Sequence, residues 1–171
     1  MDGNGVITTD DRIIYSQRPD VTFGFNNTFN YKGFDLSVFL YARLGQWIAY
    51  DYNTTYRINA LENGGNVDYW TPENPTNAFP CPNKSKSYTQ VTYYSTLKYE
   101  DGSFFKIRDI TLGYTFKPEL LKHLNLSKLR VYATAKNFFT FSKIDNYDPE
   151  QGGSISFPMT KQLVFGLNVE F

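Results

Sequence analysis

Cysteine, histidine and long apolar runs are nearly absent from this sequence of 171 residues. The single cysteine, Cys81, cannot form an internal disulfide, and the single histidine, His123, lacks the cysteine and histidine neighbours of a zinc site. The mean hydropathy is −0.45, and no stretch approaches the roughly 18 apolar residues that a transmembrane helix needs. These absences exclude a disulfide scaffold, a metal centre built from cysteine and histidine, and a membrane-spanning helix.

An excess of charge of either sign is also missing. The 17 basic side chains balance the 17 acidic ones, whereas a surface that binds nucleic acid needs clustered Lys and Arg. The chain contains no nucleophile elbow, no glycine-rich phosphate loop and no pair of histidines spaced for a metal. We therefore predict neither nucleic-acid binding nor catalysis, and we assign no catalytic residue.

Aromatic residues, by contrast, are abundant. Hydrophobic residues make up 41% of the chain and aromatic residues 18%, nearly all of them Tyr and Phe. This composition is too apolar for a disordered tail. It is typical of strands and of membrane interfaces.

Five segments alternate between apolar and polar residues, the pattern of a strand with two different faces. In the last and clearest segment, one face carries Leu163, Phe165, Leu167, Val169 and Phe171. The predicted strands are residues 21–31, 34–45, 104–116, 128–141 and 160–171. Runs of about ten to fourteen residues exceed the usual globular strand and match a tilted strand that crosses a bilayer.

Short and long connections alternate between these strands. The first and third links are short, whereas residues 46–103 and 142–159 form long connections. Bacterial outer-membrane barrels likewise have brief periplasmic turns and long external loops. We therefore predict an all-β fold, in which residues 21–171 form C-terminal strands of an antiparallel transmembrane β-barrel and residues 1–20 form an external loop.

The odd number of strands bears on how the barrel closes. Five strands cannot close a membrane barrel, so we expect them to be the last strands of a larger barrel, with further strands and the export signal before residue 1. One alternative is a complete outer-membrane barrel of about eight strands for anchoring or adhesion, for which Thr89–Lys98 is the one tempting additional strand. The other is a soluble, calcium-dependent β-sandwich that binds carbohydrate, although the charged second faces of the strands oppose it.

The first residues, DGNGVITTDD, have the spacing of a calcium-binding loop of the EF-hand type. With Gly5 at the sixth position of that loop, oxygen ligands fall at Asp2, Asn4, the carbonyl of Val6 and Asp11. The ligand of the first position would precede Met1. We predict a possible Ca²⁺ site here, and the alternative is an Asp/Asn/Gly-rich turn that binds nothing.

Aromatic side chains also gather in the long connection over 46–103. Stacking surfaces for a sugar or a peptide could come from Trp47, Tyr50, Tyr52, Tyr69 and Trp70. The alternative is an aromatic belt at the membrane boundary together with packing inside the loop, because such belts are expected at both interfaces.

Several motifs in this order resemble one family. They are ITTDDR (7–12), YKGFDLSVFLYARLG (31–45), YWTPENP (69–75), EDGSFFKIRDITLGYTF (100–116), RVYATAKNFFTF (130–141), NYDPE (146–150) and LVFGLNVEF (163–171). Together they cover most of the chain and resemble the C-terminal region of SusC/RagA-like TonB-dependent outer-membrane transporters of the Bacteroidetes.

That resemblance implies a function for a parent protein. Members of the family are barrels of about 22 strands with an N-terminal plug, and they pass through the outer membrane many times. They import oligosaccharides or peptides with a SusD-like surface lipoprotein, using energy delivered by the TonB complex. This chain would supply part of the barrel wall, and the terminal Phe171 resembles the signal that the barrel-assembly machinery reads.

Overall fold

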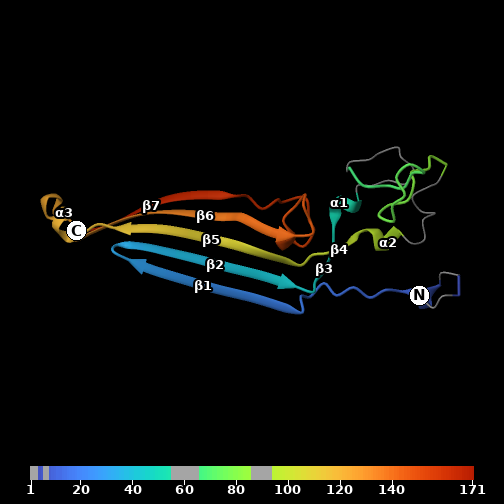
Figure 1. The fold of residues 1–171 in the computed structure, drawn as a ribbon, viewed down its shortest axis with the longest axis horizontal. Helices are drawn as coiled ribbons and strands as arrows, with labels where there is room; N and C mark the ends of the chain where they lie inside the picture. The colour runs from blue at the N-terminus through green and yellow to red at the C-terminus, as the bar shows by residue number, and fades with distance from the viewer. Residues whose placement is uncertain (1–3, 6–7, 55–65, 86–93) are drawn as a thin grey trace.

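The computed structural model describes residues 4–5, 8–54, 66–85 and 94–171. Its main feature is a five-stranded antiparallel sheet in the order β1-β2-β5-β6-β7. The strands are β1 (Val21–Tyr31), β2 (Phe34–Leu44), β5 (Phe104–Thr115), β6 (Lys128–Ser142) and β7 (Gln162–Glu170). Figure 1 shows these long strands side by side, with the short turns at one end and the long connections at the other. All five predicted strands are confirmed, with ends displaced by at most a few residues.

The turn between β1 and β2 fixes the register of the first hairpin. Tyr31 and Phe34 are paired, and the two residues between them have positive φ angles, 47° at Lys32 and 89° at Gly33. Positive φ at both central positions is the geometry of a type I′ turn, whose twist suits adjacent antiparallel strands. Glycine adopts this conformation without strain.

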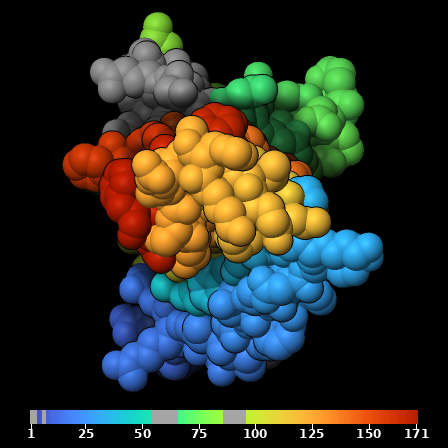
Figure 2. Space-filling view, turned by 90° about the vertical axis from the view of Figure 1, so that its left-hand side faces the viewer, coloured from blue at the N-terminus to red at the C-terminus, as the bar shows by residue number. Residues whose placement is uncertain are grey.

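The connection between β5 and β6 folds into helical turns, α3 (Pro118–Leu121) and the 3-10 helix η3 (Lys122–Leu124). Leu121 is buried, with 2% of its surface exposed, and Asn125 closes the turn in the left-handed conformation at φ 53°. Figure 2 looks at the end of the sheet that has the short turns, and the gold segment around α3 covers the middle of that end. The end with short turns is therefore compact.

One face of the sheet is apolar across all five strands, and we call it the apolar face. The register aligns Phe29, Leu36, Leu112, Ala133 and Phe165 in one row across the sheet. Of these, Phe29, Leu112 and Phe165 are 61%, 51% and 74% exposed. A continuous exposed apolar band would favour aggregation in water, but it suits the hydrocarbon core of a bilayer.

A β-bulge near the middle of β5 was not anticipated. The pairing skips Arg108, because Ile107 pairs with Leu40 of β2 whereas Asp109 pairs with Phe39. One extra residue reverses the alternation, so Phe105 and Ile107 lie on the apolar face together with the even-numbered residues from Ile110 onward. The predicted alternation assigned faces from Asp109 onward and is confirmed there, but the parity is reversed before the bulge.

The long connection between β2 and β5 contains short elements. The strands β3 (Trp47–Ala49) and β4 (Tyr99–Asp101) pair with each other, and α1 (Asp51–Thr54) and α2 (Tyr94–Leu97) lie between them in the chain. Strands of three residues are too short to show a period. The candidate strand Thr89–Lys98 is wrong over 94–97, where the backbone is helical, and its residues 89–93 lie outside the described residues.

The segment before β1 runs along the same end of the sheet as the long connections (Figure 1). It contains the 3-10 helix η1 (Thr9–Asp11). The carbonyl of Ser16 accepts a hydrogen bond from the Trp47 amide at 2.8 Å. Of the helices in the described part of the chain, none has the length and apolar character to span a membrane.

Candidate functional site

The face opposite the apolar face carries the charges and hydroxyls of the sheet, and we call it the polar face. Near the end with short turns, Arg130 of β6 reaches across β5 to Asp35 of β2, with its Nε 2.8 Å from Oδ1. Gly113 of β5 lies beneath this ion pair, because a Cβ there would come within 2.5 Å of both the Arg130 Nη2 and the Asp35 Oδ1. A glycine in the middle strand thus makes room for the bridge.

Aromatic rings continue this cross-strand pattern. The Arg130 guanidinium lies over the ring of Tyr132, 4.8 Å from its centroid. The Tyr132 ring in turn covers Gly166, its partner on β7, where a Cβ would collide with the ring. Farther along, the hydroxyls of Thr111 and Thr134 lie 2.8 Å apart across β5 and β6. The polar face is therefore a linked network and not a set of separate charges.

The centre of the candidate site is Lys106, a fully buried lysine of β5. Its ammonium donates to Asp148 Oδ1 at 2.9 Å, Asp148 Oδ2 at 2.7 Å and Glu150 Oε2 at 2.8 Å. Both acidic residues belong to residues 143–161, which we call the β6–β7 loop. Short charge-assisted bonds to a fully buried cation are strong contacts, so they fasten this loop onto the sheet.

The bulge adds a second cation to the anchor. Arg108, the bulged residue, places its Nη1 3.2 Å from Glu150 Oε1 and its guanidinium 5.4 Å from the ring centroid of Tyr41 on the polar face. The Asp148 Oδ1 also caps the 3-10 helix η4 (Pro149–Gln151) by accepting from the Glu150 amide at 3.0 Å. Two cations thus neutralise two carboxylates, and the cap fixes the local backbone.

The β6–β7 loop also packs against the connection between β2 and β5. Ile144 is buried with Ile48 and Tyr50, and Tyr52 and Tyr147 pack against this cluster. At Gly153, which has φ +91°, the backbone approaches the carbonyl of Ala49 so closely that a Cβ would collide with it. The amide of Asp51 donates to the Gly153 carbonyl at 3.0 Å. The two long connections are therefore joined to each other.

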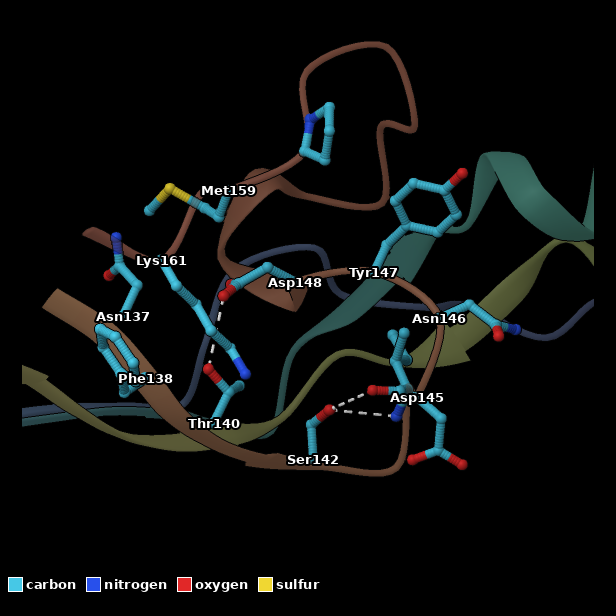
Figure 3. A pocket seen from close by; sticks show the side chains of 12 residues that line it. Asn137, Phe138, Thr140, Ser142, Asp145, Asn146, Tyr147, Asp148, Met159 and Lys161 are labelled. Atoms are coloured by element: carbon cyan, nitrogen blue, oxygen red, sulfur yellow. Dashed lines mark hydrogen bonds between the residues drawn. The ribbon is translucent and has the colours of Figure 1, made fainter. Parts of the chain in front are cut away.

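A cavity of about 330 Å³ lies between β6 and the β6–β7 loop. Thr140 and Ser142 line it from β6, Asp148 from the anchored turn, and Met159 and Lys161 from the end of the loop. Figure 3 shows these side chains around the cavity. Its lining combines hydroxyl, carboxylate, ammonium and apolar groups, so it suits a small polar ligand or one unit of a longer one.

Three groups in the long connections have shifted pKa values. Burial raises the pKa of Tyr50 to about 12. Hydrogen bonds from Ser103 lower the pKa of Asp101, and the ammonium of Lys143, 3.0 Å from Asp101 Oδ2, acts in the same direction. Hydrogen bonds from Thr76 and Asn74 lower the pKa of Asp68. Asp101 and Asp68 are thus stabilised as carboxylates, whereas Tyr50 is stabilised as the neutral phenol.

The predicted aromatic ligand-binding residues are separated in the structure. Trp47 belongs to β3 and lies against Tyr15, with ring centroids 4.5 Å apart and the ring planes tilted by 39°. Tyr69 and Trp70 are 43% and 42% exposed, and Trp70 donates its amide to the Phe79 carbonyl at 2.9 Å. Within the described ranges, Trp47 makes no ring contact with Tyr69 or Trp70. Their role in binding stays a prediction.

The predicted calcium segment is only partly visible. Asp2 and Val6 lie outside the described residues. Gly5 has φ +78°, which suits the tight reversal at the sixth position, and Asp11 Oδ2 accepts from the Thr8 amide at 3.0 Å. Among the described residues, no group of three or more His, Cys, Asp or Glu side chains is arranged to hold a metal ion. Calcium binding therefore stays a prediction.

The terminal residue Phe171 is 94% exposed, and its carbonyl accepts from the Ser127 hydroxyl at 3.3 Å. Its role in assembly is likewise a prediction. Sequence reasoning missed the anchor of Lys106, Asp148 and Glu150. The available signal was a lysine at a polar position between Phe104, Phe105 and Ile107, because such a cation needs an acidic partner if it is buried.

The chain is similar in sequence to a group of bacterial receptors. An alignment of 194 residues that covers its whole length shows 30% identity to TonB-dependent receptor P3 of Formosa agariphila. The chain is 31% identical over 99% of its length to TonB-dependent receptor SusC of Bacteroides thetaiotaomicron. These alignments cover 18% and 17% of the relatives, so the chain spans less than a fifth of their length. No protein-family model matches the chain.

The fold is similar to solved transporter structures. The RagAB peptide transporter matches with a TM-score of 0.74 and 27% identity, covering 94% of this chain and 18% of that one. The RagAB peptide importer in its open-open state matches with a TM-score of 0.69 and 28% identity. The sheet thus corresponds to part of a transporter barrel, which confirms the predicted fold class. Because these relatives are receptors and transporters, the prediction that the chain is not an enzyme is also confirmed.

Proposed function

This chain belongs to the SusC-like TonB-dependent receptors, and from that membership we propose that it forms part of the barrel wall of a nutrient importer. TonB-dependent receptors are β-barrel proteins of the outer membrane. The observation that carries the proposal is that the two faces of one sheet differ in polarity. The apolar face has exposed apolar side chains on each of the five strands, whereas the polar face is linked by ion pairs such as Asp35–Arg130. A lipid-facing and a lumen-facing surface need this division.

The importer would take up oligosaccharides or peptides. The similarity to a structure described as a peptide importer supports peptides, and the exposed aromatic rings of Tyr69 and Trp70 provide stacking surfaces that would also suit sugars. A SusD-like surface lipoprotein would cover the external end, and the TonB complex would act through the rest of the parent protein. In this arrangement the long connections of this chain face the incoming cargo.

Energy-dependent uptake tests this proposal. The full-length parent protein is expressed in cells with and without TonB, and uptake of labelled short peptides and labelled oligosaccharides is measured alongside the amount of protein in the outer membrane. We expect uptake of one of the two classes, dependent on TonB, and a lipoprotein that co-purifies in detergent. Equal uptake with and without TonB, or recovery of the parent protein in the aqueous fraction, contradicts the proposal.

We also propose Ca²⁺ binding by the loop that contains Asn4 and Asp11, supported by the ligand spacing and by the conformation of Gly5. The metal content of the purified full-length protein, measured with Asp11→Asn as the comparison, tests this separately from transport. Loss of about one bound calcium in the variant is expected. Equal calcium content in both proteins contradicts the site.

A further inference from the structure

The cavity between β6 and the β6–β7 loop has a charge balance that indicates a ligand. Asp148 lines the cavity, but its carboxylate is occupied: both oxygens accept from Lys106, and Oδ2 also lies 3.4 Å from the Thr140 hydroxyl. Its negative charge is therefore neutralised by a cation that lies under the cavity wall.

The ammonium of Lys161 differs from every other charge in the lining. In Figure 3 its side chain points into the cavity toward Thr140, whereas the carboxylate of Asp145 points away. Among the residues that the structure describes, the Lys161 ammonium has no hydrogen bond or ion pair. Of the charged side chains in the lining, Lys161 is therefore the one that points into the cavity without an ionic partner among the described residues, whereas Asp148 is paired with Lys106 and Asp145 points away.

The other lining groups are compatible with an organic acid. Phe138, Pro158 and Met159 provide apolar surface, and Thr140 provides a hydroxyl in the same lining. The volume of about 330 Å³ lies at the lower limit for small-molecule sites, so it accommodates one residue or one sugar unit and not a complete oligomer.

We propose that this cavity is a subsite for one carboxylate-bearing unit of the cargo, in which Lys161 binds the carboxylate and the buried Lys106 holds Asp148 of the cavity lining in place. The inference rests on the proposed import function, because it assumes that cargo passes this surface. The carboxylate can belong to a peptide or to a uronic-acid sugar. Lys161 contacts the ligand, whereas Lys106 is a positioning residue that acts through Asp148.

Protection of Lys161 from an amine-acetylating reagent tests the site on the purified full-length protein in detergent. The peptide probe is Gly-Glu-Gly, compared with the amide of Gly-Gln-Gly. The sugar probe is digalacturonic acid, compared with lactose. Mass spectrometry follows acetylation at Lys161 and at Lys143, which is 78% exposed on the same loop and does not line the cavity. Lys143 therefore serves as the internal control.

One of the two acids should slow acetylation of Lys161, approaching about tenfold when the probe is at about ten times its Kd, and leave Lys143 unchanged. The acid that protects identifies the source of the carboxylate. The variant Lys161→Gln should weaken binding of that acid about tenfold, as expected for loss of a charge-assisted hydrogen bond. Lys143→Gln, which removes the same charge from the same loop, should bind normally.

Protection by the neutral probes to the same extent, or protection by neither acid, overturns the subsite. Equal affinities of Lys161→Gln and the wild-type protein also overturn it. These results do not depend on uptake, because the measurement uses purified protein without TonB. If Lys161 is protected but uptake proves independent of TonB, the subsite stands and the proposed import function fails.

Discussion

Replacing Lys106 by methionine should release the β6–β7 loop from the sheet. The Lys106 side chain is fully buried, and the Asp148 and Glu150 side chains that bind it are only 12% and 10% exposed. Methionine has a similar length but no charge, so both carboxylates would stay in a poorly hydrated environment. Of the two carboxylates, Arg108 pairs with Glu150 and not with Asp148, so Asp148 would lose its ionic partner.

The size of the effect follows from burial. Breaking a buried ion pair by removing one partner costs about 3–5 kcal/mol, mostly because the remaining charge is left without compensation. We expect this loss to appear locally, because the loop can separate and hydrate while the sheet stays paired. A loss of about 3 kcal/mol in local stability would speed amide hydrogen exchange in the loop about 100-fold.

Hydrogen exchange of the full-length protein in detergent, followed by mass spectrometry of peptides covering 145–153, measures this effect. The matched control is Lys128→Met. Lys128 contacts Glu170 at a similar distance, 2.9 Å, but the two side chains are 48% and 60% exposed, so the expected loss is below about 1 kcal/mol. Equal, small changes in both variants would falsify the argument that burial makes the Lys106 contact strong. Unchanged exchange in β5 and β6 verifies that the sheet stays folded.

Three further predictions concern the packing, a shifted pKa and assembly. Gly113→Ala should separate Arg130 from Asp35, because the new Cβ would lie 2.5 Å from atoms of both. The stability of the detergent-solubilised barrel should fall by about 1–3 kcal/mol, and an unchanged thermal unfolding temperature contradicts this. Burial raises the pKa of Tyr50 from 10.0 to about 12, so its contribution to stability is complete below pH 10 and is lost as the pH rises through 12. Tyr50→Phe should therefore show a smaller loss of stability over that range, measured by chemical denaturation, and an identical loss in both proteins argues against it. Deletion of Phe171 should reduce the amount of full-length protein in the outer membrane without changing its synthesis, and equal membrane levels on immunoblots exclude a role in assembly.

The strands could be predicted because apolar and polar residues alternate regularly along them. In β7, each second residue from Leu163 to Val169 is apolar, and a single bilayer-facing surface explains all of them. The bulge at Arg108 was missed for the same reason. On one side of the bulge the odd-numbered residues Phe105 and Ile107 are apolar, and on the other side the even-numbered residues Ile110 and Leu112 are. The change of parity was therefore present in the sequence, although the predicted faces were taken only from Asp109 onward.

The anchor could not be predicted from spacing. Lys106 and Asp148 are separated by 42 residues, and each belongs to a motif that resembles the same family. Motifs indicate which residues belong together in a family, but they do not indicate contacts between loops. Contacts such as that of Gly153 with Ala49 depend on backbone approach, and side-chain chemistry gives no signal for them.

The anchor divides the β6–β7 loop into two kinds of positions. One kind is fixed by buried charge or by close backbone contact and comprises Asp148, Glu150 and Gly153. Most substitutions at these positions should disturb the attachment of the loop to the rest of the structure. Asp145, Asn146 and Lys161 are exposed and lie on the same loop around the cavity, so substitutions there alter the chemistry of the surface without releasing it. Under the proposed import function, stability and cargo preference would then depend on different residues of one loop. If the subsite has the proposed role, changes of cargo preference should therefore arise at the exposed positions and not at the anchor.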